Sequence, residues 1–499
     1  MIRPGCLFVA VVTIFLRCGG FARGQTEYFA VFMEGKKAGY SIHSRVVADG
    51  KVTTTDKVRI EIGRGAIPVA MEVNETSIET TYGKVLGFEV EQNLAIMAMK
   101  ITGTVNEQGK VKVTSRSMGL EQTSEIEWPK GALMAEGVRL LELEKGLKPG
   151  VEYTAKIFSA SSMKALDTKV RIGAKRNVDL LGRVAALTEV KTTIVMPDVG
   201  EIISTGYVDD EFRLQKNVTP MMGMKIELIA CAKEFALGKN DVVDFIDKMV
   251  VASPAPLENV REATSVSYHL VAVSQGEDLK IPSTDNQSVH RLGDGKVAVI
   301  VEPVKAKRGS VFPYTPDNND ALEMLKPTRY VQSDSNEIIE LARKAVGQTQ
   351  DAAEAVKKIE SFVGDYIRQK DFSVGYASAA EVAASRMGDC SEHAVLTAAL
   401  CRAVGIPARV VCGLVYADEF AGRRNIFGGH AWTEAYVGSV WVGLDATRAP
   451  DGFDAGHITL ATGDGEPSEF FSLVNTFGRF KIEKIAVVID QKKKDTAGE

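Results

Sequence analysis

The period of the hydrophobic pattern changes near residue 330. From residue 28 to about residue 304 the chain carries short runs in which polar and apolar residues alternate, such as 57–62 and 110–114, broken by Gly, Asn and Asp. Alternation of this kind is typical of strands with one buried face. After Pro327 apolar residues recur at helical spacing instead. The pattern predicts an antiparallel β region followed by a domain of α+β class.

The length of the chain sets the number of domains. Its 499 residues, 45% hydrophobic and 25% charged, are ordinary for globular protein but too many for one core. We expect five segments, which are a signal peptide at 1–24, an antiparallel β-rich domain at 25–253, a small β module or linker at 254–319, an α+β domain at 320–490 and a charged tail at 491–499.

The N-terminus resembles a secretory signal. Arg3 precedes an apolar run at 7–16, and small residues follow up to Gly24, where cleavage is expected. The run is shorter than the roughly 20 residues that a membrane-spanning helix needs. Arg17 occupies the place where a lipid-attachment site at Cys18 would need a small residue, so no lipid anchor is expected. The sequence predicts export to a periplasmic or extracellular location.

Charge and composition limit the classes of partner that this protein is expected to bind. The net charge of −5 gives no basic footprint for nucleic acid, and the lysine run at 492–494 is typical of a solvated tail. No segment after the signal is long and apolar enough to predict an integral membrane span. A peptide or protein substrate is the expected partner, and the sequence leaves the oligomeric state open.

Cysteine usage predicts neither a disulfide framework nor a metal site. Without the signal peptide, Cys231, Cys390, Cys401 and Cys412 remain. Four cysteines in so long a chain are not a disulfide scaffold, although an exported protein could pair two of them. No Cys-x-x-Cys motif is present and the six histidines are scattered, so no metal or cofactor is expected.

Capping signals predict a series of helices after residue 330. The acceptor Asp334 and the acid three residues later predict a helix that ends near Gly347, and a second helix is expected at about 351–368. A third should begin at Ser378, where Glu381 completes a capping box, and stop at Gly388.

Cys390 opens a fourth predicted helix, whose residues 394–403 are apolar almost all round and therefore belong in a core. Gly405 ends it, and a strand should begin at Ala408. Unpaired amides and the helix dipole at a helix N-terminus favour a thiolate, which predicts a pKa for Cys390 below the usual ~8.5.

A histidine and an aspartate lie on two runs, 432–437 and 440–445, that Gly438 and Ser439 join. A tight two-residue turn would pair these runs as a hairpin and place Asp445 opposite Trp432. His430 and Asp445 would then share one face as diagonal neighbours about 7–8 Å apart at the backbone.

Each of these residues also has an ordinary interpretation. A cysteine in an apolar helix is usually a core residue, a strand histidine beside tryptophan usually packs, and an aspartate before threonine usually caps a turn. Together, Cys390, His430 and Asp445 have the order of a nucleophile, its base and the acid that orients the base. His393 is an alternative base, but it has no identifiable carboxylate partner at strand spacing.

Four stretches resemble the transglutaminase-like superfamily, namely GDCSEHA at 388–394, CRAVGIPARVV at 401–411, GHAWTE at 429–434 and WVGLDAT at 441–447. The resemblance covers roughly residues 320–490. It implies a papain-like α+β core with Cys390 as nucleophile, His430 as general base and acid, and Asp445 as orienting carboxylate. Ala446 departs from the proline that the family often has there.

The resemblance also implies an activity. The thiolate would attack an amide or peptide carbonyl to give a thioester, which water or an amine then takes. We expect a cysteine peptidase or amidase acting on an extracytoplasmic peptide, with a cross-linking transglutaminase or a non-catalytic binding protein with a vestigial triad as alternatives. The Cys390 amide is a candidate oxyanion donor, and a second donor near Tyr376 or Ser378 stays open.

Two further features have more than one interpretation. The charged, glycine-containing segment at 416–428 has the composition of a mobile flap over a cleft, or of an ordinary connection. The β-rich half could bind a lipid, a glycan or a peptide, or serve only as a scaffold.

Overall fold

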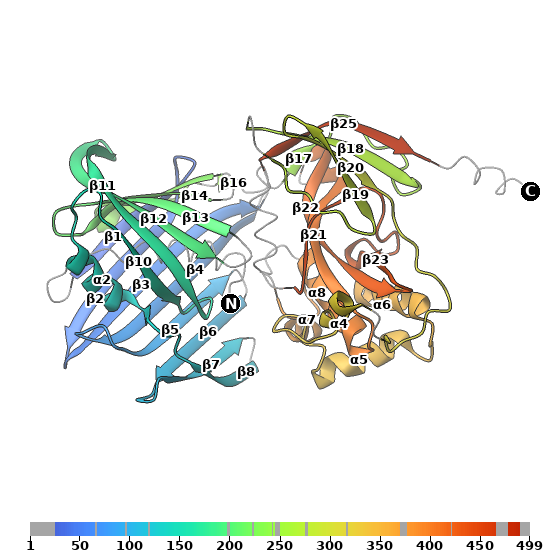
Figure 1. Cartoon of the computed structure of the whole chain (residues 1–499), viewed down its shortest axis with the longest axis horizontal. Coiled ribbons are helices and arrows are strands. Elements are labelled where there is room, and N and C mark those ends of the chain that lie inside the picture. Colours follow the sequence, from blue (N-terminus) through green and yellow to red (C-terminus); the bar gives the residue numbers. More distant parts are fainter. Residues whose placement is uncertain are drawn as a thin grey trace, which may run out of the picture. The chain divides into compact units, whose positions relative to one another are not determined.

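The computed structural model describes residues 25–489 apart from 65–66, 95–96, 118–119, 197–199, 222–223, 242, 245–249, 275–277, 316–317, 370–376, 421 and 466–477. The expected signal peptide, with Cys18, and the charged tail lie outside the described residues. The chain divides into two compact units, Met1–Phe245 and Ile246–Glu499 (Figure 1). Strands dominate, and most of them pair antiparallel.

The first unit is built on one large sheet. Its strands in chain order are β1 (Gln25–Met33), β2 (Lys36–Ala48), β3 (Lys51–Arg64), β4 (Ile67–Thr80), β5 (Val85–Leu94), β6 (Met97–Val105), β7 (Lys110–Ser117), β8 (Leu120–Glu127), β9 (Ala132–Leu133), β10 (Glu152–Ser159), β11 (Lys164–Leu180), β12 (Arg183–Met196), β13 (Gly200–Val208), β14 (Leu214–Met221), β15 (Met224–Ala230) and β16 (Val243–Asp244). The sheet order runs from β8 back to β1, then from β15 back to β9, and β16 joins β3. Only β9–β10 and β3–β16 are parallel among the pairs of this sheet in the described residues.

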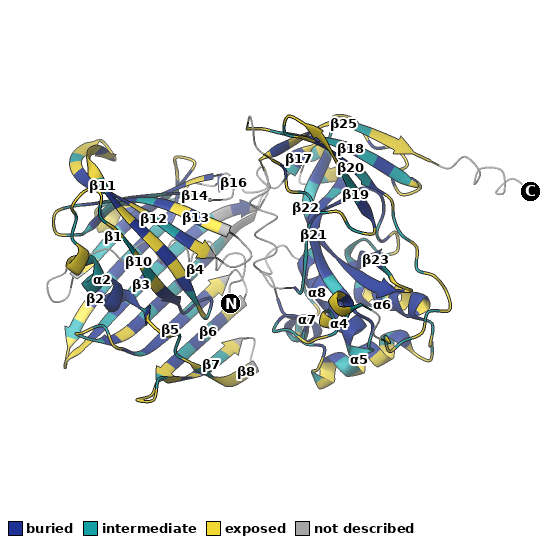
Figure 2. Ribbon diagram, viewed as in Figure 1, coloured by how far each residue is buried: buried dark blue, intermediate teal, exposed yellow. Residues whose placement is uncertain are grey.

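The alternation of polar and apolar residues in the sequence explains why these segments form strands. Buried and partly exposed positions alternate along β3 and the middle of β2, as the strand pattern predicts (Figure 2). The predicted strands at 57–62 and 110–114 lie in β3 and β7, so these predictions are confirmed. The turn between β1 and β2 places Gly35 at a φ of 79°, a conformation that glycine adopts without steric cost.

A strand glutamate caps helix α2 (Ala135–Lys145) of the first unit. The residue before the helix, Met134, supplies no side-chain cap. Instead the backbone amides of Glu136 and Gly137 donate to Glu79 of β4 at 2.7 and 3.0 Å, and Glu79 is fully buried. This carboxylate therefore satisfies two first-turn amides that the helix itself leaves without partners. A short helix, α3 (Lys233–Ala236), follows β15.

The second unit combines two sheets with a group of helices. Its strands are β17 (Val250–Ala252), β18 (Ser265–Ala272), β19 (Gln287–Gly293), β20 (Lys296–Val301), β21 (Ala408–Phe420), β22 (Arg423–Val437), β23 (Val440–Leu444), β24 (His457–Gly463) and β25 (Phe480–Val488). Its helices are α4 (Asn319–Glu323), α5 (Asn336–Val346), α6 (Ala352–Tyr366), α7 (Ala379–Ser385), α8 (Cys390–Ala403) and the 3₁₀ helix η2 (Ala446–Arg448). The helices gather at one end of β21 and β22 (Figure 1).

The two sheets of this unit draw on distant parts of the chain. One sheet has the order β17-β22-β21-β24, with β23 paired to β22, and the other has the order β19-β20-β18-β25. Strands from the small module expected at 254–319 thus share a sheet with β25, near the end of the described chain. No helix within the described residues combines the length and apolarity that crossing a bilayer requires.

The capping signals located the helices well. Asp351 caps α6, and Ser378 and Glu381 form the predicted capping box of α7. The N-cap of α5 is Ser335, so the choice of Asp334 was wrong by one residue. Helix α7 ends at Arg386, which takes a left-handed conformation, so the predicted stop at Gly388 was two residues late.

Helix α8 is buried from Ser391 to Arg402, as its apolar composition predicts. It lies against β22, where the Thr433 hydroxyl donates to the Ala394 carbonyl at 2.8 Å. The β22–β23 hairpin has the predicted register, with Val437 opposite Val440 and Thr433 opposite Leu444. The predictions of this helix and this register are confirmed.

The segment at 416–428, interpreted from sequence as either a mobile flap or an ordinary connection, is instead mostly paired strand. This segment continues β21 and begins β22, with Tyr416 opposite Phe427 and Phe420 opposite Arg423. Charged side chains at the far end of a hairpin have the composition of a loop, and that composition misled the interpretation. Buried Phe427, in edge contact with Tyr268 at 5.5 Å between ring centroids, anchors the hairpin to the second sheet.

The Glu79 cap predicts a large effect on stability. Replacing Glu79 by Ala leaves two buried amides without an acceptor, which should lower the free energy of unfolding by about 1–3 kcal/mol. Chemical denaturation measures this change, and Glu79→Gln, which keeps one acceptor, should lose less. The control is Glu144→Ala on the same helix, because the Glu144 side chain is 67% exposed and its loss should cost under about 0.5 kcal/mol. Equal effects of Glu79→Ala and Glu144→Ala would contradict the assignment of the cap.

Candidate active site

The start of α8 is held by a capping box. The Asp389 carboxylate accepts from the Ser391 amide at 3.2 Å, while Glu392 reaches back to the Asp389 amide at 3.0 Å. Glu392 is fully buried and also accepts from the Ala377 amide at 2.7 Å. These contacts fix the position of Cys390, the first residue of the helix.

The sulfur of Cys390 lies beside strand β22. The backbone amide of Ala431 hydrogen-bonds to it, which places the thiol next to the strand position that carries His430. Cys390 keeps part of its surface accessible, and none of the cysteines in the described part of the chain, Cys231, Cys390, Cys401 and Cys412, forms a disulfide.

The prediction that the helix start lowers the pKa of Cys390 was wrong. Burial raises the pKa of this thiol well above its ordinary value, and the nearby carboxyl groups of Asp389, Glu392 and Asp445 act in the same direction. The hydrogen bond from Ala431 opposes them without prevailing. In the resting protein Cys390 therefore holds its proton, and a base must remove that proton before sulfur can attack.

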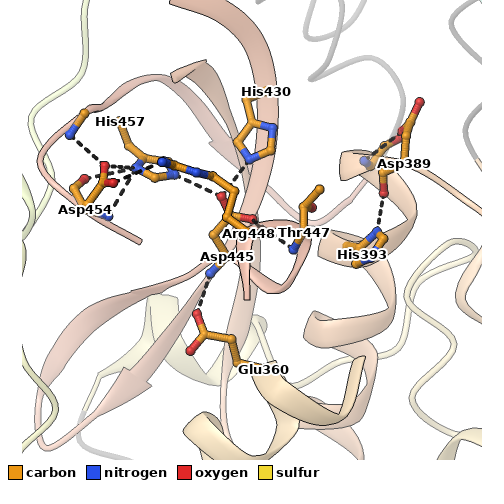
Figure 3. Close-up of polar contacts among 11 residues, drawn as sticks. Glu360, Asp389, His393, His430, Asp445, Thr447, Arg448, Asp454 and His457 are labelled. Atoms are coloured by element: carbon orange, nitrogen blue, oxygen red, sulfur yellow. Dashed lines mark hydrogen bonds and ion pairs between the residues drawn. The ribbon is translucent and has the colours of Figure 1, made fainter. Parts of the chain in front are cut away.

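His430 and Asp445 form a direct pair. The Nε2 atom of His430, on β22, lies 2.7 Å from Oδ2 of Asp445, the residue that precedes η2 (Figure 3). His430 is 7% exposed and Asp445 is fully buried. The shared face that the hairpin parity predicts is therefore present, although Asp445 lies just past the end of β23.

The backbone around Asp445 is held as firmly as its side chain. Its amide donates to Oε1 of Glu360, on α6, at 2.7 Å, and its Oδ1 accepts from the Thr447 amide at 3.1 Å. Glu360 is itself buried and pairs with Lys357 at 2.8 Å. Helix α6 thus positions Asp445, a contribution that the sequence gave no reason to expect.

Asp445 stays ionised although it is buried. Burial alone would raise the pKa of this carboxyl, but His430 and a second histidine, His457, lower it far below its ordinary value. A buried carboxylate stays ionised when positive or hydrogen-bonding partners surround it. Asp445 is therefore an anion at neutral pH and can orient the ring of His430.

His457 was missed by sequence reasoning. It is the first residue of β24, fully buried, and its Nε2 lies 3.0 Å from the same Oδ2 of Asp445 that His430 contacts (Figure 3). The one local signal is Asp454, three residues earlier, which contacts its other ring nitrogen. Nothing in the spacing from Asp445 indicated that this segment folds back onto the hairpin.

His393 lies apart from this group. Its Nδ1 contacts the backbone carbonyl oxygen of Asp389 at 2.6 Å, and the ring is buried in α8 (Figure 3). The ring nitrogen that faces this carbonyl must carry a proton to make a hydrogen bond. The arrangement favours a structural role for His393 and leaves His430 as the base with a carboxylate partner.

His430, Asp445 and His457 have side chains of the kinds that bind metal ions. One ligand atom each from His430, Asp445 and His457 lies within 4.8 Å of the others. However, both histidines direct Nε2 to one carboxylate oxygen at hydrogen-bond distance, 2.7 and 3.0 Å. The geometry is that of a hydrogen-bonded row, and we assign no cation to it.

One family model matches part of this chain. Residues 339–446 match the model of the transglutaminase-like superfamily. The matched segment runs from α5 to η2 and contains Cys390, His430 and Asp445. The C-terminal unit therefore carries a core of the transglutaminase-like superfamily.

Three solved structures are similar to parts of this chain. A candidate cysteine protease from Cytophaga hutchinsonii is 22% identical over 45% of this chain and 85% of its own, with a TM-score of 0.30. A β-barrel-like protein of the domain of unknown function DUF1849 from Brucella abortus is 11% identical over 42% of this chain and 97% of its own, with a TM-score of 0.32. A candidate protease from Parabacteroides distasonis is 11% identical over 82% of this chain and 69% of its own, with a TM-score of 0.20. No curated protein matches the sequence.

Because Glu360 holds the Asp445 backbone, replacing Glu360 should lower the activity although Glu360 is not one of the proposed catalytic residues. Replacing Glu360 by Ala frees the Asp445 backbone, and misplacing an orienting group by about 1 Å can slow a reaction roughly a hundredfold. Glu360→Gln keeps an acceptor and should retain most of the rate. Lys357→Ala is the matched control on the same helix, since it removes the ion pair but leaves the contact with the Asp445 amide. Steady-state kinetics on a peptide substrate distinguish these variants, and a Glu360→Ala rate equal to that of the Lys357→Ala control would contradict the role.

Proposed function

We propose that this protein is a thiol-dependent acyl-transfer enzyme, in which Cys390 is the nucleophile, His430 the general base and acid, and Asp445 the orienting carboxylate. The observation that carries the proposal is the 2.7 Å pair of His430 and Asp445 on the strand whose Ala431 amide contacts the Cys390 sulfur. Three segments far apart in the chain meet there. The superfamily match over residues 339–446 supports the same assignment and a papain-like core.

The tautomer of His430 follows from its partner. Its Nε2 faces the Asp445 carboxylate, so this nitrogen carries a hydrogen and Nδ1 is the atom that can accept a proton. Because the Cys390 thiol is protonated at rest, Nδ1 takes that proton as sulfur attacks the carbonyl carbon of the substrate. The developing imidazolium is stabilised by ionised Asp445.

The reaction then proceeds through a thioester. Sulfur bonds to the carbonyl carbon, the carbon–nitrogen bond of the amide breaks, and the imidazolium of His430 returns its proton to the departing amine. Backbone amides at the start of α8 are candidate donors to the oxyanion. Water, deprotonated by His430, next attacks the thioester carbon, which releases a carboxylic acid and restores the thiol.

Hydrolysis is the outcome that we favour. The N-terminal sequence is typical of a secretory signal, and export would bring the enzyme to extracytoplasmic peptides. Transfer to an amine would use the same thioester and give cross-linking instead. The substrate is therefore proposed as a peptide or protein amide in the periplasm or outside the cell.

The triad predicts a graded loss of activity. Cys390→Ala removes the nucleophile and His430→Ala removes the base, and each should lower kcat by a factor on the order of 10³ or more. Asp445→Asn keeps the shape but favours the wrong tautomer of His430, so a loss of similar order is expected. Hydrolysis of a mixed peptide library, followed by mass spectrometry, measures the change. Cys231→Ala, in the other unit, should keep the wild-type rate, and full activity of Cys390→Ala would contradict the proposal.

The acceptor of the acyl group can be read in the same assay. Adding a tagged primary amine separates the two outcomes, because hydrolysis releases a free acid while transfer incorporates the tag. We expect cleavage without incorporation. Incorporation in preference to cleavage would assign the protein as a cross-linking enzyme with the same triad.

Alkylation predicts a dependence on pH that distinguishes an enzyme from a vestigial site. The raised pKa of Cys390 means that its thiolate forms spontaneously only above the ordinary value of ~8.5. At pH 7.5 labelling by iodoacetamide should therefore require His430, and His430→Ala should slow it on the order of a hundredfold. The variant should recover labelling as the pH rises, since deprotonation then no longer needs a base. Peptide mapping locates the label, and an unchanged rate in His430→Ala would favour a non-catalytic binding protein.

A further inference from the structure

A buried histidine lies between two carboxylates behind the proposed triad. Nε2 of His457 is 3.0 Å from Oδ2 of Asp445, and Nδ1 is 3.0 Å from Oδ1 of Asp454 (Figure 3). His457 is fully buried and Asp454 is 5% exposed. Both ring nitrogens thus face a carboxylate oxygen inside the protein.

The two carboxylates favour a particular protonation state of the His457 ring. A neutral imidazole carries one N–H, so one nitrogen would direct a lone pair at a carboxylate, whereas an imidazolium donates to both. Nδ1 also lies 3.0 Å from the Asp454 carbonyl oxygen, a second acceptor, while the Asp454 amide points at Nδ1 from 3.2 Å, a contact that only an unprotonated Nδ1 would accept. The two carboxylates raise the pKa of His457 despite its burial, and His457 lowers the pKa of Asp454.

The row continues to an arginine. Nη1 of Arg448 lies 3.2 Å from Oδ2 of Asp454, and the Gly456 amide donates to Oδ1 of Asp454 at 2.8 Å. Positive and negative groups therefore alternate from Arg448 through Asp454 and His457 to Asp445. The rings of Trp432 and Phe453 lie 5.1 and 4.6 Å from the His457 ring, so the row is walled by aromatic side chains.

We propose that His457 is a positioning residue of the active site, which as an imidazolium holds Asp445 against His430 and offsets part of the Asp445 charge. The inference rests on the proposed function, because it concerns the same triad. It adds two members, His457 and Asp454, to the three that the superfamily resemblance implies.

The charge of His457 has a consequence for the base. The ring centroids of His430 and His457 are 5.9 Å apart, close enough for one positive charge to disfavour another. The other charged groups around the row are Asp445 after β23, Glu360 and its partner Lys357 on α6, and Asp389 and Glu392 beside Cys390 on α8. Each of these is present in all the variants below, so a change in pH dependence reports on the His457 charge.

The pH profile of the enzyme tests this charge. In kcat/KM against pH, the acid limb reports the need for an unprotonated Nδ1 on His430, because only that form can take the Cys390 proton. His457→Gln keeps a neutral donor toward Asp445 but removes the positive charge, so this limb should move to higher pH by roughly one unit. Asp454→Asn, which weakens the protonation of His457, should move it in the same direction by less. His290→Gln, an exposed histidine of β19 in the same unit, is the control and should leave the profile unchanged.

A spectroscopic measurement tests the inference without any activity. Imidazole ¹⁵N NMR of the full chain should show both nitrogens of His457 protonated at pH 7.5, with His457→Gln identifying the signal. A neutral His457 in that spectrum would overturn the proposal, even if the triad is active. A fall in rate at every pH, with no shift of the acid limb, would also overturn it and leave a purely structural role. Inactivity of the wild type with a charged His457 would instead contradict the proposed function while supporting the row.

Discussion

The carboxylate of Asp445 is the interaction on which the site depends. A buried anion is costly unless hydrogen bonds and opposite charges surround it, and Asp445 has both. Two histidine rings share one of its oxygens, and the amides of Thr447 and Arg448 contact the other. Helix α6 fixes the backbone through Glu360. The loop after β23 therefore has one stable arrangement, and that arrangement orients the ring of His430.

Two opposed effects act on the protonation of Cys390, the proposed nucleophile, at the start of α8. The dipole and free amides of α8 favour a thiolate, whereas burial and the acids of the capping box favour the neutral thiol. Burial prevails because α8 lies inside the core and the acids that cap it, Asp389 and Glu392, are immediate neighbours of Cys390. Cys390 is thus a neutral thiol at rest, and under the proposed function its reactivity would depend on proton transfer to His430.

The core of the second unit explains why this precision is possible. Helix α8 is packed on nearly every side, and Thr433 of β22 bonds directly to its backbone. Gly413 of β21 allows the close approach of β24, because a side chain there would meet the Ile458 carbonyl and the Trp432 ring. The strand that carries His457 therefore reaches the hairpin that carries His430. The proposed nucleophile, the proposed base and His457 all lie on elements of one core.

The sequence by itself determined the local structure of the site. The helix starts at Asp351 and Ser378 and the two-residue turn at 438–439 depend on neighbouring residues, so they located the helices and set the β22–β23 register. Only the tertiary structure decided what depends on distant contacts. The hairpin at 416–428 is stabilised by packing of Phe427, the direction of the Cys390 pKa shift depends on how deeply α8 is buried, and His457 meets Asp445 because β24 pairs with β21. Burial and long-range pairing are properties of the folded chain, and no spacing of residues within one segment encodes them.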